Sequence, residues 1–399
     1  MVAAEMETLV FACDFDVTPA GYRPESWTSR SVCWTEAPRL PPADLRNKVG
    51  GMEFGIAVAS PLDSWKVVKR AEELGFSHAW FYDTQMLSPD IFVTMALAAE
   101  RTSKIKLGSG VFVPSNRIAP VCANGIASLN RLAPGRIICG LGTGFTARNT
   151  MGLPPIKLGE LREYIRIIRG LLGGETVEVD FPEGRRKIRF LNPEGLINIE
   201  DRVPIHLSAF APKARKLTAE VADGWMTFVF DIDRALGEAK QIDDACREVG
   251  RKQSLYKTAF NLGCVLGDKE PIDSARAKAQ AGPLAVVFLH GLVEATLSLS
   301  LPPAIRTLVE DYRKQHATYA PADARYLQMH TLHLLGVRPE EERFLTPELI
   351  RATTLTGRAD ELVERIRALE KGGYQQFVIQ LVHGQESAVE DWARVCERV

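Results

Sequence analysis

From Met52 onward, short apolar runs alternate with segments whose apolar residues recur at helical spacing. The apolar runs are continuous, which is typical of parallel strands that are buried on both faces. The strand candidates are 53–58, 78–82, 105–112, 136–141, 204–208, 225–229, 258–265 and 376–381. Eight such strands, most of them joined by one helix each, predict an α/β fold of the TIM (β/α)8 barrel type. An open doubly wound sheet is the alternative.

Two connections depart from this simple alternation. The segments TVEVDF and RKIRFL, within residues 176–191, indicate a hairpin. Residues 283–355, between the seventh and eighth strands, form a long and less regular helical stretch. Both ends of this stretch approach the barrel face that carries active sites, so we expect an insertion that acts as a lid. An oligomer contact or helical padding is the alternative.

The first 51 residues show no sustained period of 2 or 3.6 and are rich in proline. One interpretation is an N-terminal extension that is disordered or wraps the barrel bottom or a neighbouring subunit. The other is a translated leader upstream of a true start at Met52. In both interpretations residues 52–399 form the barrel.

The composition excludes several classes of function. The 49 basic and 50 acidic residues give a net charge of −1, so no global field recruits nucleic acid or an anionic membrane. The seven cysteines never form C-x-x-C, which indicates a reducing compartment and argues against zinc. A membrane-spanning run is missing from the sequence, and the start is a poor secretory signal. We therefore expect a cytoplasmic protein that acts on a small molecule.

In a barrel, the functional site lies at the carboxyl ends of the strands. The candidates there are mostly small or hydroxyl-bearing residues with one carboxylate: Asp83, Ser109, Gly110, Val111, Thr143, Gly144, Phe145, Ser208, Ala209 and Phe210. This set contains no paired carboxylates, metal-ligand cluster or nucleophile with its base. It favours the binding of a flat, polar-edged molecule, so the chemistry would belong to a cofactor.

Several candidates also have a structural interpretation. GLGTG (140–144) is more often a tight turn than a phosphate loop, and Asp83 can cap the segment that follows it. The motif HTLH places His330 and His333 three residues apart, where one helical face could present them to a metal. With no third ligand nearby, a surface or packing role is favoured, and no metal is expected. As parts of the lid, His330, His333 and Tyr326 are candidate catalytic or substrate-binding groups. His206, inside a strand, indicates a core histidine.

Three blocks of sequence carry a resemblance to a known family. They are LGSGVFVPSNRIAPVCANGIASLNRLAPGRIICGLGTG (107–144), VPIHLSAFAPKARKLTAEVADGWM (203–226) and TGRADELVERIRALEKGGYQQFVIQ (356–380). Their order and spacing resemble the bacterial luciferase-like flavin-dependent oxidoreductases. The branch that includes methylenetetrahydromethanopterin reductase-like enzymes is the most similar. The resemblance covers about residues 52–265 and 356–399.

The resemblance implies a place for the cofactor. A flavin or deazaflavin ring would rest against the third strand, where related enzymes have a non-prolyl cis peptide that matches Gly110–Val111 here. Asp83 matches the acid after the second strand. Residues 143–145 and 208–211, the latter including Ala211, match segments that line the ring and the phosphate-bearing tail. Thr84 departs from the histidine that deazaflavin-using relatives commonly have at this position.

Three functions follow from this resemblance. The first, which we favour at this point, is a monooxygenase that uses reduced FMN and oxygen on a small organic substrate, with a flavin reductase as the partner that supplies the reduced FMN. The second is a reductase or dehydrogenase that uses the deazaflavin coenzyme F-420. The third is a non-catalytic flavin-binding barrel. A homodimer is expected in each case, and the substrate depends on the divergent insertion.

Overall fold

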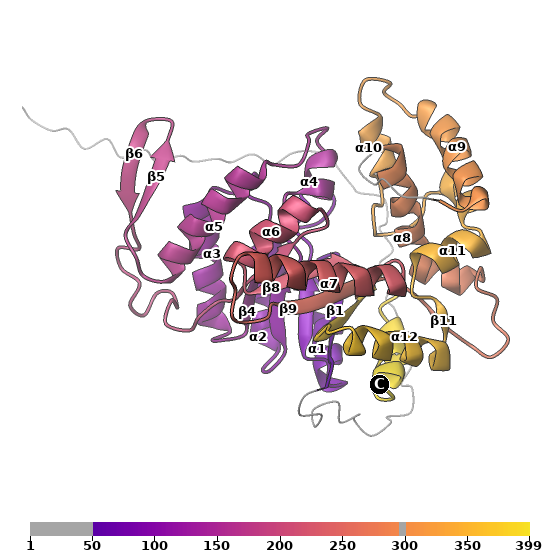
Figure 1. The fold of residues 1–399 in the computed structure, drawn as a ribbon, viewed down its shortest axis with the longest axis horizontal. Coiled ribbons are helices and arrows are strands. Elements are labelled where there is room, and N and C mark those ends of the chain that lie inside the picture. Colours follow the sequence, from indigo (N-terminus) through magenta and orange to yellow (C-terminus); the bar gives the residue numbers. More distant parts are fainter. Residues whose placement is uncertain (1–50, 295–300) are drawn as a thin grey trace, which may run out of the picture. The chain divides into compact units, whose positions relative to one another are not determined.

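The computed structural model describes residues 51–294 and 301–399 (Figure 1). Our expectations for residues 1–50 fall outside this part of the chain. Eight parallel strands close into a barrel in the order β1-β12-β9-β8-β7-β4-β3-β2. They are β1 (Glu53–Val58), β2 (His78–Phe81), β3 (Lys106–Ser109), β4 (Ile137–Leu141), β7 (Ile205–Ser208), β8 (Gly224–Phe228), β9 (Tyr256–Asn261) and β12 (Gln376–Leu381). The predicted TIM barrel is confirmed.

Helices follow the strands, and most of them cover the outside of the barrel. They are α1 (Trp65–Glu73), α2 (Ile91–Arg101), α3 (Ala119–Leu132), the short α4 (Phe145–Asn149), α5 (Leu158–Leu172), α6 (Pro212–Val221), α7 (Ile232–Glu248), α12 (Ala359–Lys371) and α13 (Ala388–Cys396). The short α4 instead lies at a cavity of the barrel. The strands β5 (Val177–Phe181) and β6 (Gly184–Ile188) pair antiparallel, which confirms the predicted hairpin. In α5, the buried residues Leu161, Ile165 and Ile168 follow the helical period and form its barrel-facing stripe.

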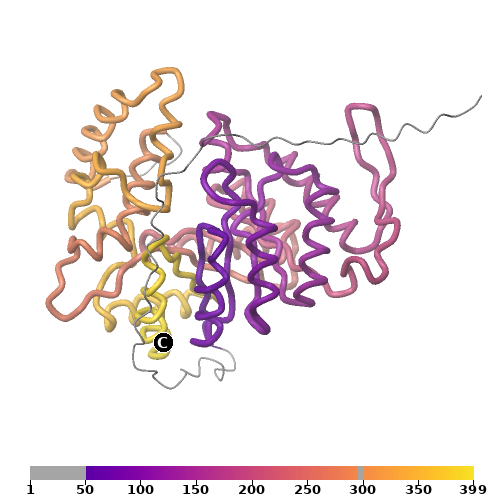
Figure 2. Tube along the Cα trace, turned by 180° about the vertical axis from the view of Figure 1, so that it is seen from behind, coloured from indigo at the N-terminus to yellow at the C-terminus, as the bar shows by residue number. Residues whose placement is uncertain are grey.

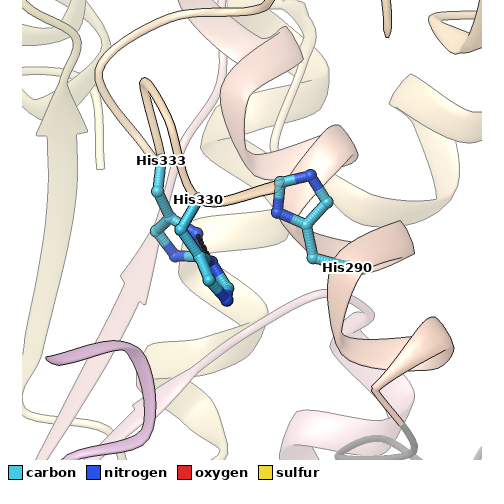
Figure 3. A group of neighbouring side chains, drawn as sticks. All are labelled: His290, His330 and His333. Carbon is cyan, nitrogen blue, oxygen red and sulfur yellow. Dashed lines mark hydrogen bonds between the residues drawn. The ribbon is translucent and has the colours of Figure 1, made fainter. Parts of the chain in front are cut away.

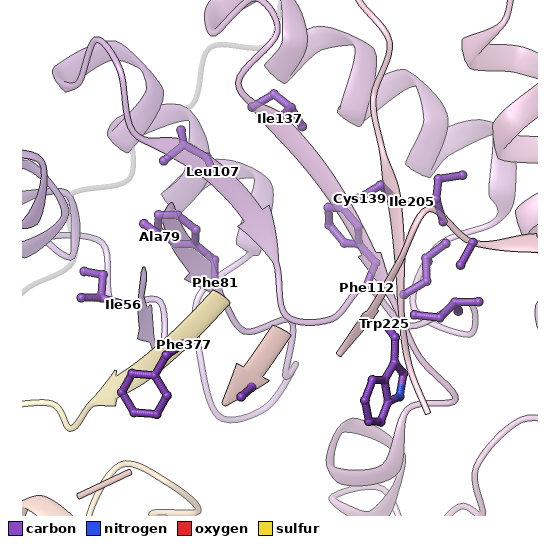
Figure 4. Packing of buried hydrophobic residues seen from close by; sticks show 14 of the residues in the cluster. Ile56, Ala79, Phe81, Leu107, Phe112, Ile137, Cys139, Ile205, Trp225 and Phe377 are labelled. Atoms are coloured by element: carbon purple, nitrogen blue, oxygen red, sulfur yellow. The ribbon is translucent and has the colours of Figure 1, made fainter. Parts of the chain in front are cut away.

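Side chains along each barrel strand alternate between two buried layers. On β2, Ala79 and Phe81 pack toward the helices, whereas Trp80 belongs to the cluster that fills the barrel interior. Figure 4 shows part of the outer layer, including Leu107, Ile137 and Trp225. Because both layers are apolar, the strands have the continuous apolar sequences from which the barrel was predicted.

The helices between β9 and β12 pack into a cluster of their own. They are α8 (Ala275–Val293), α9 (Pro303–Ala317), α10 (Arg325–Met329), the 3-10 helix η2 (Pro339–Phe344) and α11 (Pro347–Thr353). These helices, in orange, gather together in both views of the chain (Figures 1 and 2). Their core contains Leu289, Tyr312, Phe344 and Leu349. The first helix of this insertion starts at Ala275 and continues through Pro283 without a break.

The base of the insertion is pinned by a short parallel pair, β10 (Val265–Leu266) with β11 (Gly357–Arg358). The two ends of the insertion are therefore held side by side below its helices. Among the described helices, none has the length and apolarity needed to cross a membrane.

The close approach of β3 to β4 gives the first prediction. A Cβ atom added to Gly140 would lie 1.9 Å from the backbone oxygen of Ser109. We expect Gly140→Ala to lower the free energy of unfolding by about 1–3 kcal/mol, because backbone atoms must move apart. Chemical denaturation measures this change. The matched control is Gly159→Ala in α5, where a Cβ meets no atom within 4 Å and should stabilise the helix by up to about 1 kcal/mol. Equal stability of both variants would contradict the tight register of β3 and β4.

Candidate active site

A cavity of about 630 Å³ opens at the carboxyl ends of the barrel strands and is closed on one side by the helical insertion. Most of the residues selected from the sequence line it: Asp83, Gly110, Val111, Thr143, Gly144, Phe145, Ser208, Ala209, Phe210, Ala211, His330 and His333. The structure thus brings together residues that are far apart in the sequence, such as Asp83 and His333, which are separated by 250 positions.

The floor of the cavity lies at the end of β3. The Gly110–Val111 peptide is cis, as predicted. Ser109 is not among the lining residues: its hydroxyl donates to the carbonyl of Gly140 at 2.8 Å and accepts from the Gly140 amide at 2.9 Å. Ser109 is paired in register with Phe81, whose side chain packs toward the helices, so Ser109 faces the same way. The residue therefore supports the strand that carries the floor.

Asp83 lies at the cavity wall with its carboxylate already paired. Its side chain is 4% exposed, and Arg117 donates to it at 2.8 Å while also bonding Asp90 at 2.6 Å. Burial raises the pKa of the Asp83 carboxyl, and the charge of Arg117 opposes that shift. A carboxylate held in this way is suited to orienting the loop after β2 and a ligand edge.

One end of the cavity is positively charged. The first turn of α6 begins at Pro212, and its first amides, which a helix leaves without partners inside the helix, offer a site for an anion together with Lys213. A smaller pocket of about 240 Å³ adjoins this end, since both pockets share Leu158, Lys213 and Leu217. Its polar lining comes from α5 and α6: Arg162, Lys213, Lys216 and Glu220.

The insertion contributes three buried histidines to the cavity wall. His290 comes from α8, whereas His330 and His333 lie on the turn that follows α10 (Figure 3). The two are not on one helical face, because the left-handed backbone of Leu332 (φ 61°) ends helical geometry between them. The expectation that no third ligand lies near this pair was wrong, because His290 lies beside it. One ring nitrogen of each of the three histidines lies within 4.8 Å of the others.

Hydrogen bonds join these histidines into a chain. His330 Nδ1 lies 3.1 Å from His333 Nδ1, and His330 Nε2 lies 2.9 Å from Glu294 Oε1. His333 Nε2 lies 3.3 Å from the hydroxyl of Thr146 on α4. Burial lowers the pKa of His333 well below its usual range, and the charges of His330 and His290 act in the same direction. His333 is therefore a neutral imidazole near pH 7.

On the far side of this group, His290 Nε2 lies 2.9 Å from Glu341 Oε1. Glu341 also accepts from Tyr312 at 2.6 Å and from Arg338. Burial pushes the pKa of Glu341 upward, but hydrogen bonds from His290, Arg338 and Tyr312 outweigh it and hold that pKa at about 2. An ionised carboxylate thus lies behind the histidines.

Two further candidates lie outside the cavity lining. The ring of Tyr326 packs at Gly152, where an added Cβ would lie 2.7 Å from it. His206 is buried between Trp80 and Tyr256, as a core histidine should be, and burial lowers its pKa to about 4. Neither residue reaches the chain of histidines.

Sequence analysis missed His290 and Glu294. Both lie in the apolar run LAVVFLHGLVEATLSLSL, where they are four residues apart and therefore on one face of a helix. A histidine and a glutamate at this spacing inside an otherwise apolar helix are expensive to bury unless they have partners. The spacing of His290 and Glu294 was therefore the sequence signal that could have indicated a buried polar group in this helix.

The sequence of the chain is similar to known proteins along most of the barrel. A sequence profile described as luciferase-like monooxygenase matches residues 53–376. The chain is 33% identical over 243 residues to a 5,10-methylenetetrahydromethanopterin reductase of Methanolobus tindarius, covering 60% of this chain and 71% of that protein. It is 30% identical over 306 residues to an F-420-dependent glucose-6-phosphate dehydrogenase of Microbacterium testaceum, covering 69% and 87%.

The fold is also shared with solved structures. The coenzyme F-420-dependent tetrahydromethanopterin reductase of Methanopyrus kandleri superposes with a TM-score of 0.62 at 23% identity. The match covers 86% of this chain and 98% of that one. The resemblance found in the sequence, including its leaning toward the methylenetetrahydromethanopterin reductases, is confirmed.

Proposed function

Because the chain belongs to the luciferase-like monooxygenase family and is an oxidoreductase, we propose that it uses the deazaflavin coenzyme F-420 to oxidise or reduce a small organic substrate. The observation that favours this cofactor is the smaller pocket of about 240 Å³ next to the first turn of α6. Because Arg162, Lys213 and Lys216 line it, we call it the cationic pocket. FMN ends at its phosphate, whereas F-420 continues into an acidic tail of lactyl and glutamyl groups. A tail of that kind needs basic residues outside the main cavity.

The lining residues fit such a cofactor. The barrel end of the cavity is apolar, with Val111, Met226 and Phe228 offering a dry surface for a flat ring. The phosphate would lie at the first turn of α6 with Lys213. Lys216 would then meet the acidic tail, together with Arg162, whose guanidinium is already paired with Glu220 in the same pocket lining. When bound, F-420 supplies a ring carbon that accepts or donates a hydride.

The chain's own residues handle the proton that accompanies hydride transfer. Oxidation of an alcohol, or reduction of a carbonyl, requires a group that takes or gives a proton at the substrate oxygen. His333 and Thr146 both line the cavity, and the one hydrogen-bond contact of His333 Nε2 within the described residues is the long one to the Thr146 hydroxyl at 3.3 Å, so a substrate oxygen could take the place of that hydroxyl. His330 contacts His333, and Glu294 contacts His330, so these two residues would orient the ring of His333.

Monooxygenation with reduced FMN is the second candidate. It is favoured by Thr84, which lines the cavity where deazaflavin-using relatives commonly have histidine, and by the name of the matching family. In this second candidate no part of the cofactor reaches Lys216, and Arg162 has Glu220 as its partner. The two candidates therefore differ in what the cationic pocket binds.

Cofactor titration separates them. We expect the protein to bind F-420 more tightly than FMN, followed by absorbance and fluorescence. Lys216→Glu should weaken F-420 binding about tenfold, because it replaces an attraction to the acidic tail by a repulsion, while FMN binding stays unchanged. The matched control is Lys240→Glu on the exposed face of α7, which should bind both cofactors like the wild type. Tighter binding of FMN, with Lys216→Glu silent for both cofactors, would transfer the proposal to the monooxygenase.

A further inference from the structure

We propose that His290, His330 and His333 form a binding site for one divalent first-row transition metal ion, such as Zn²⁺, in the wall of the cavity. The proposed hydride transfer does not require this ion. The inference rests on the arrangement of the three imidazoles and of the carboxylates behind them.

In each histidine, one ring nitrogen lies within hydrogen-bond distance of a residue other than the three histidines. The outer nitrogen is Nε2 in every case, and it lies 2.9 Å from Glu341 for His290, 2.9 Å from Glu294 for His330 and 3.3 Å from Thr146 for His333. A partner on Nε2 that accepts a proton leaves the lone pair on Nδ1. In protein metal sites, ligating histidines almost always donate their other ring N–H to a carboxylate, carbonyl or water.

The inner nitrogens face one another. His330 Nδ1 and His333 Nδ1 are 3.1 Å apart, and His290 Nδ1 is buried without a hydrogen-bond partner among the described residues. Figure 3 shows the ring of His290 directed toward the other two. At Zn–N bonds of about 2.0–2.1 Å, two ligands of a tetrahedral ion lie about 3.3 Å apart. The spacing of His330 and His333 is close to that value, and one ring nitrogen of His290 lies within 4.8 Å of theirs, so His290 would have to move closer to complete the set.

The hydrogen bonds within the group do not by themselves account for this geometry. Facing Nδ1 atoms can share only one proton, and a proton between them still leaves His290 Nδ1 unpaired. A buried polar atom without a partner is costly, and native structures usually pair it with water or an ion. A metal ion satisfies all three inner nitrogens at once.

The group also has an open side. All three histidines line the cavity, so a fourth ligand can approach from within it. Three protein ligands and one open position are the pattern of catalytic rather than structural zinc. On the proposed hydride-transfer function, the ion would bind the oxygen of an alcohol or carbonyl substrate and polarise it. With the ion bound, it replaces His333 as the group that contacts the substrate oxygen.

Metal binding can be measured without cofactor or substrate. The full-length protein is stripped with a chelator and titrated with Co²⁺, whose visible absorption reports coordination by protein ligands, and Zn²⁺ is then added in competition. We expect one Co²⁺ per chain, displaced by Zn²⁺. His290→Ala should weaken binding at least tenfold, and Glu341→Gln about 10- to 100-fold, as loss of a carboxylate behind a ligand does. His383→Ala, an exposed histidine paired with Glu386, is the matched control and should bind like the wild type.

Two results would overturn the proposal. One is a wild-type protein that shows no Co²⁺ absorption and no Zn²⁺ uptake, a measurement that needs no variant to fold. The other is unchanged binding by a folded His290→Ala variant, which would place any ion elsewhere. Because cofactor titration is a separate measurement, a metal site without F-420 binding, or the reverse, distinguishes failure of this inference from failure of the proposed function.

Discussion

Replacing His333 by alanine is expected to lower kcat about 100-fold while the affinity for the cofactor stays unchanged. His333 lines the cavity, and its Nε2 atom is the end of the histidine chain that a substrate oxygen can reach. Loss of a group that transfers a proton, or that holds an ion at the substrate oxygen, costs about 10²–10⁴ in rate. The proposed ring and phosphate contacts are on the barrel side of the cavity, so on that proposal the cofactor dissociation constant should not respond. Steady-state kinetics on a panel of alcohols and carbonyls, with cofactor titration alongside, measures both quantities.

His330 acts through His333, so its replacement needs a different readout. His330→Ala should lower kcat and also shift its pH dependence, because His333 loses the neighbour 3.1 Å away that orients it. A purely structural role would lower kcat equally at all pH values. Thr331→Ala is the control: within the described residues, this exposed hydroxyl donates to the Leu327 carbonyl in the same turn and has no other partner. Full turnover in both histidine variants would make the insertion a scaffold rather than part of the site.

The barrel was predictable because its signals are local. Continuous apolar runs and amphipathic helices such as α5 follow from periods of a few residues, and strand ends were located within a few positions. Once the topology is known, the carboxyl ends of the strands converge, which is why Gly110, Thr143 and Ser208 were found. The Ser109 assignment failed as a lining residue because side chains alternate along a strand, so its neighbour Gly110 faces the cavity and Ser109 does not.

The histidine group was beyond the reach of the same reasoning. His290 lies 40 residues before His330, and no helical or strand periodicity of the sequence links two positions so far apart. Their contact depends on how α8, α9 and η2 pack around Tyr312 and Phe344, which is a property of the insertion core. The turn that carries His330 and His333 also depends on left-handed backbone at two leucines, Leu332 between the histidines and Leu334 after them, a conformation that the sequence does not indicate.

The same packing makes Glu341 the residue on which the insertion depends most. Its side chain is 2% exposed and accepts hydrogen bonds from His290, Tyr312 and Arg338. The side chain of Arg338 is itself 5% exposed. We expect Glu341→Ala to lower the free energy of unfolding by about 3–5 kcal/mol, because it leaves a buried guanidinium without its main partner. Glu340→Ala is the matched control, since this neighbour is 33% exposed and its bond to Arg338 should contribute less than about 1 kcal/mol.

The pH dependence of stability tests the cause of this effect. The pKa of Glu341 falls from an ordinary 4.5 to about 2 in the folded protein. A group with a lowered folded pKa stabilises the protein fully above the unfolded pKa, and that contribution is lost as the pH falls toward the folded pKa. The difference in unfolding free energy between wild type and Glu341→Gln should therefore be constant from pH 7 to 5. It should then shrink by up to about 3 kcal/mol between pH 5 and 2. Urea denaturation across this range measures the difference, and a gap that stays constant down to pH 2 would show that packing alone, and not the ionised carboxylate, holds the insertion together.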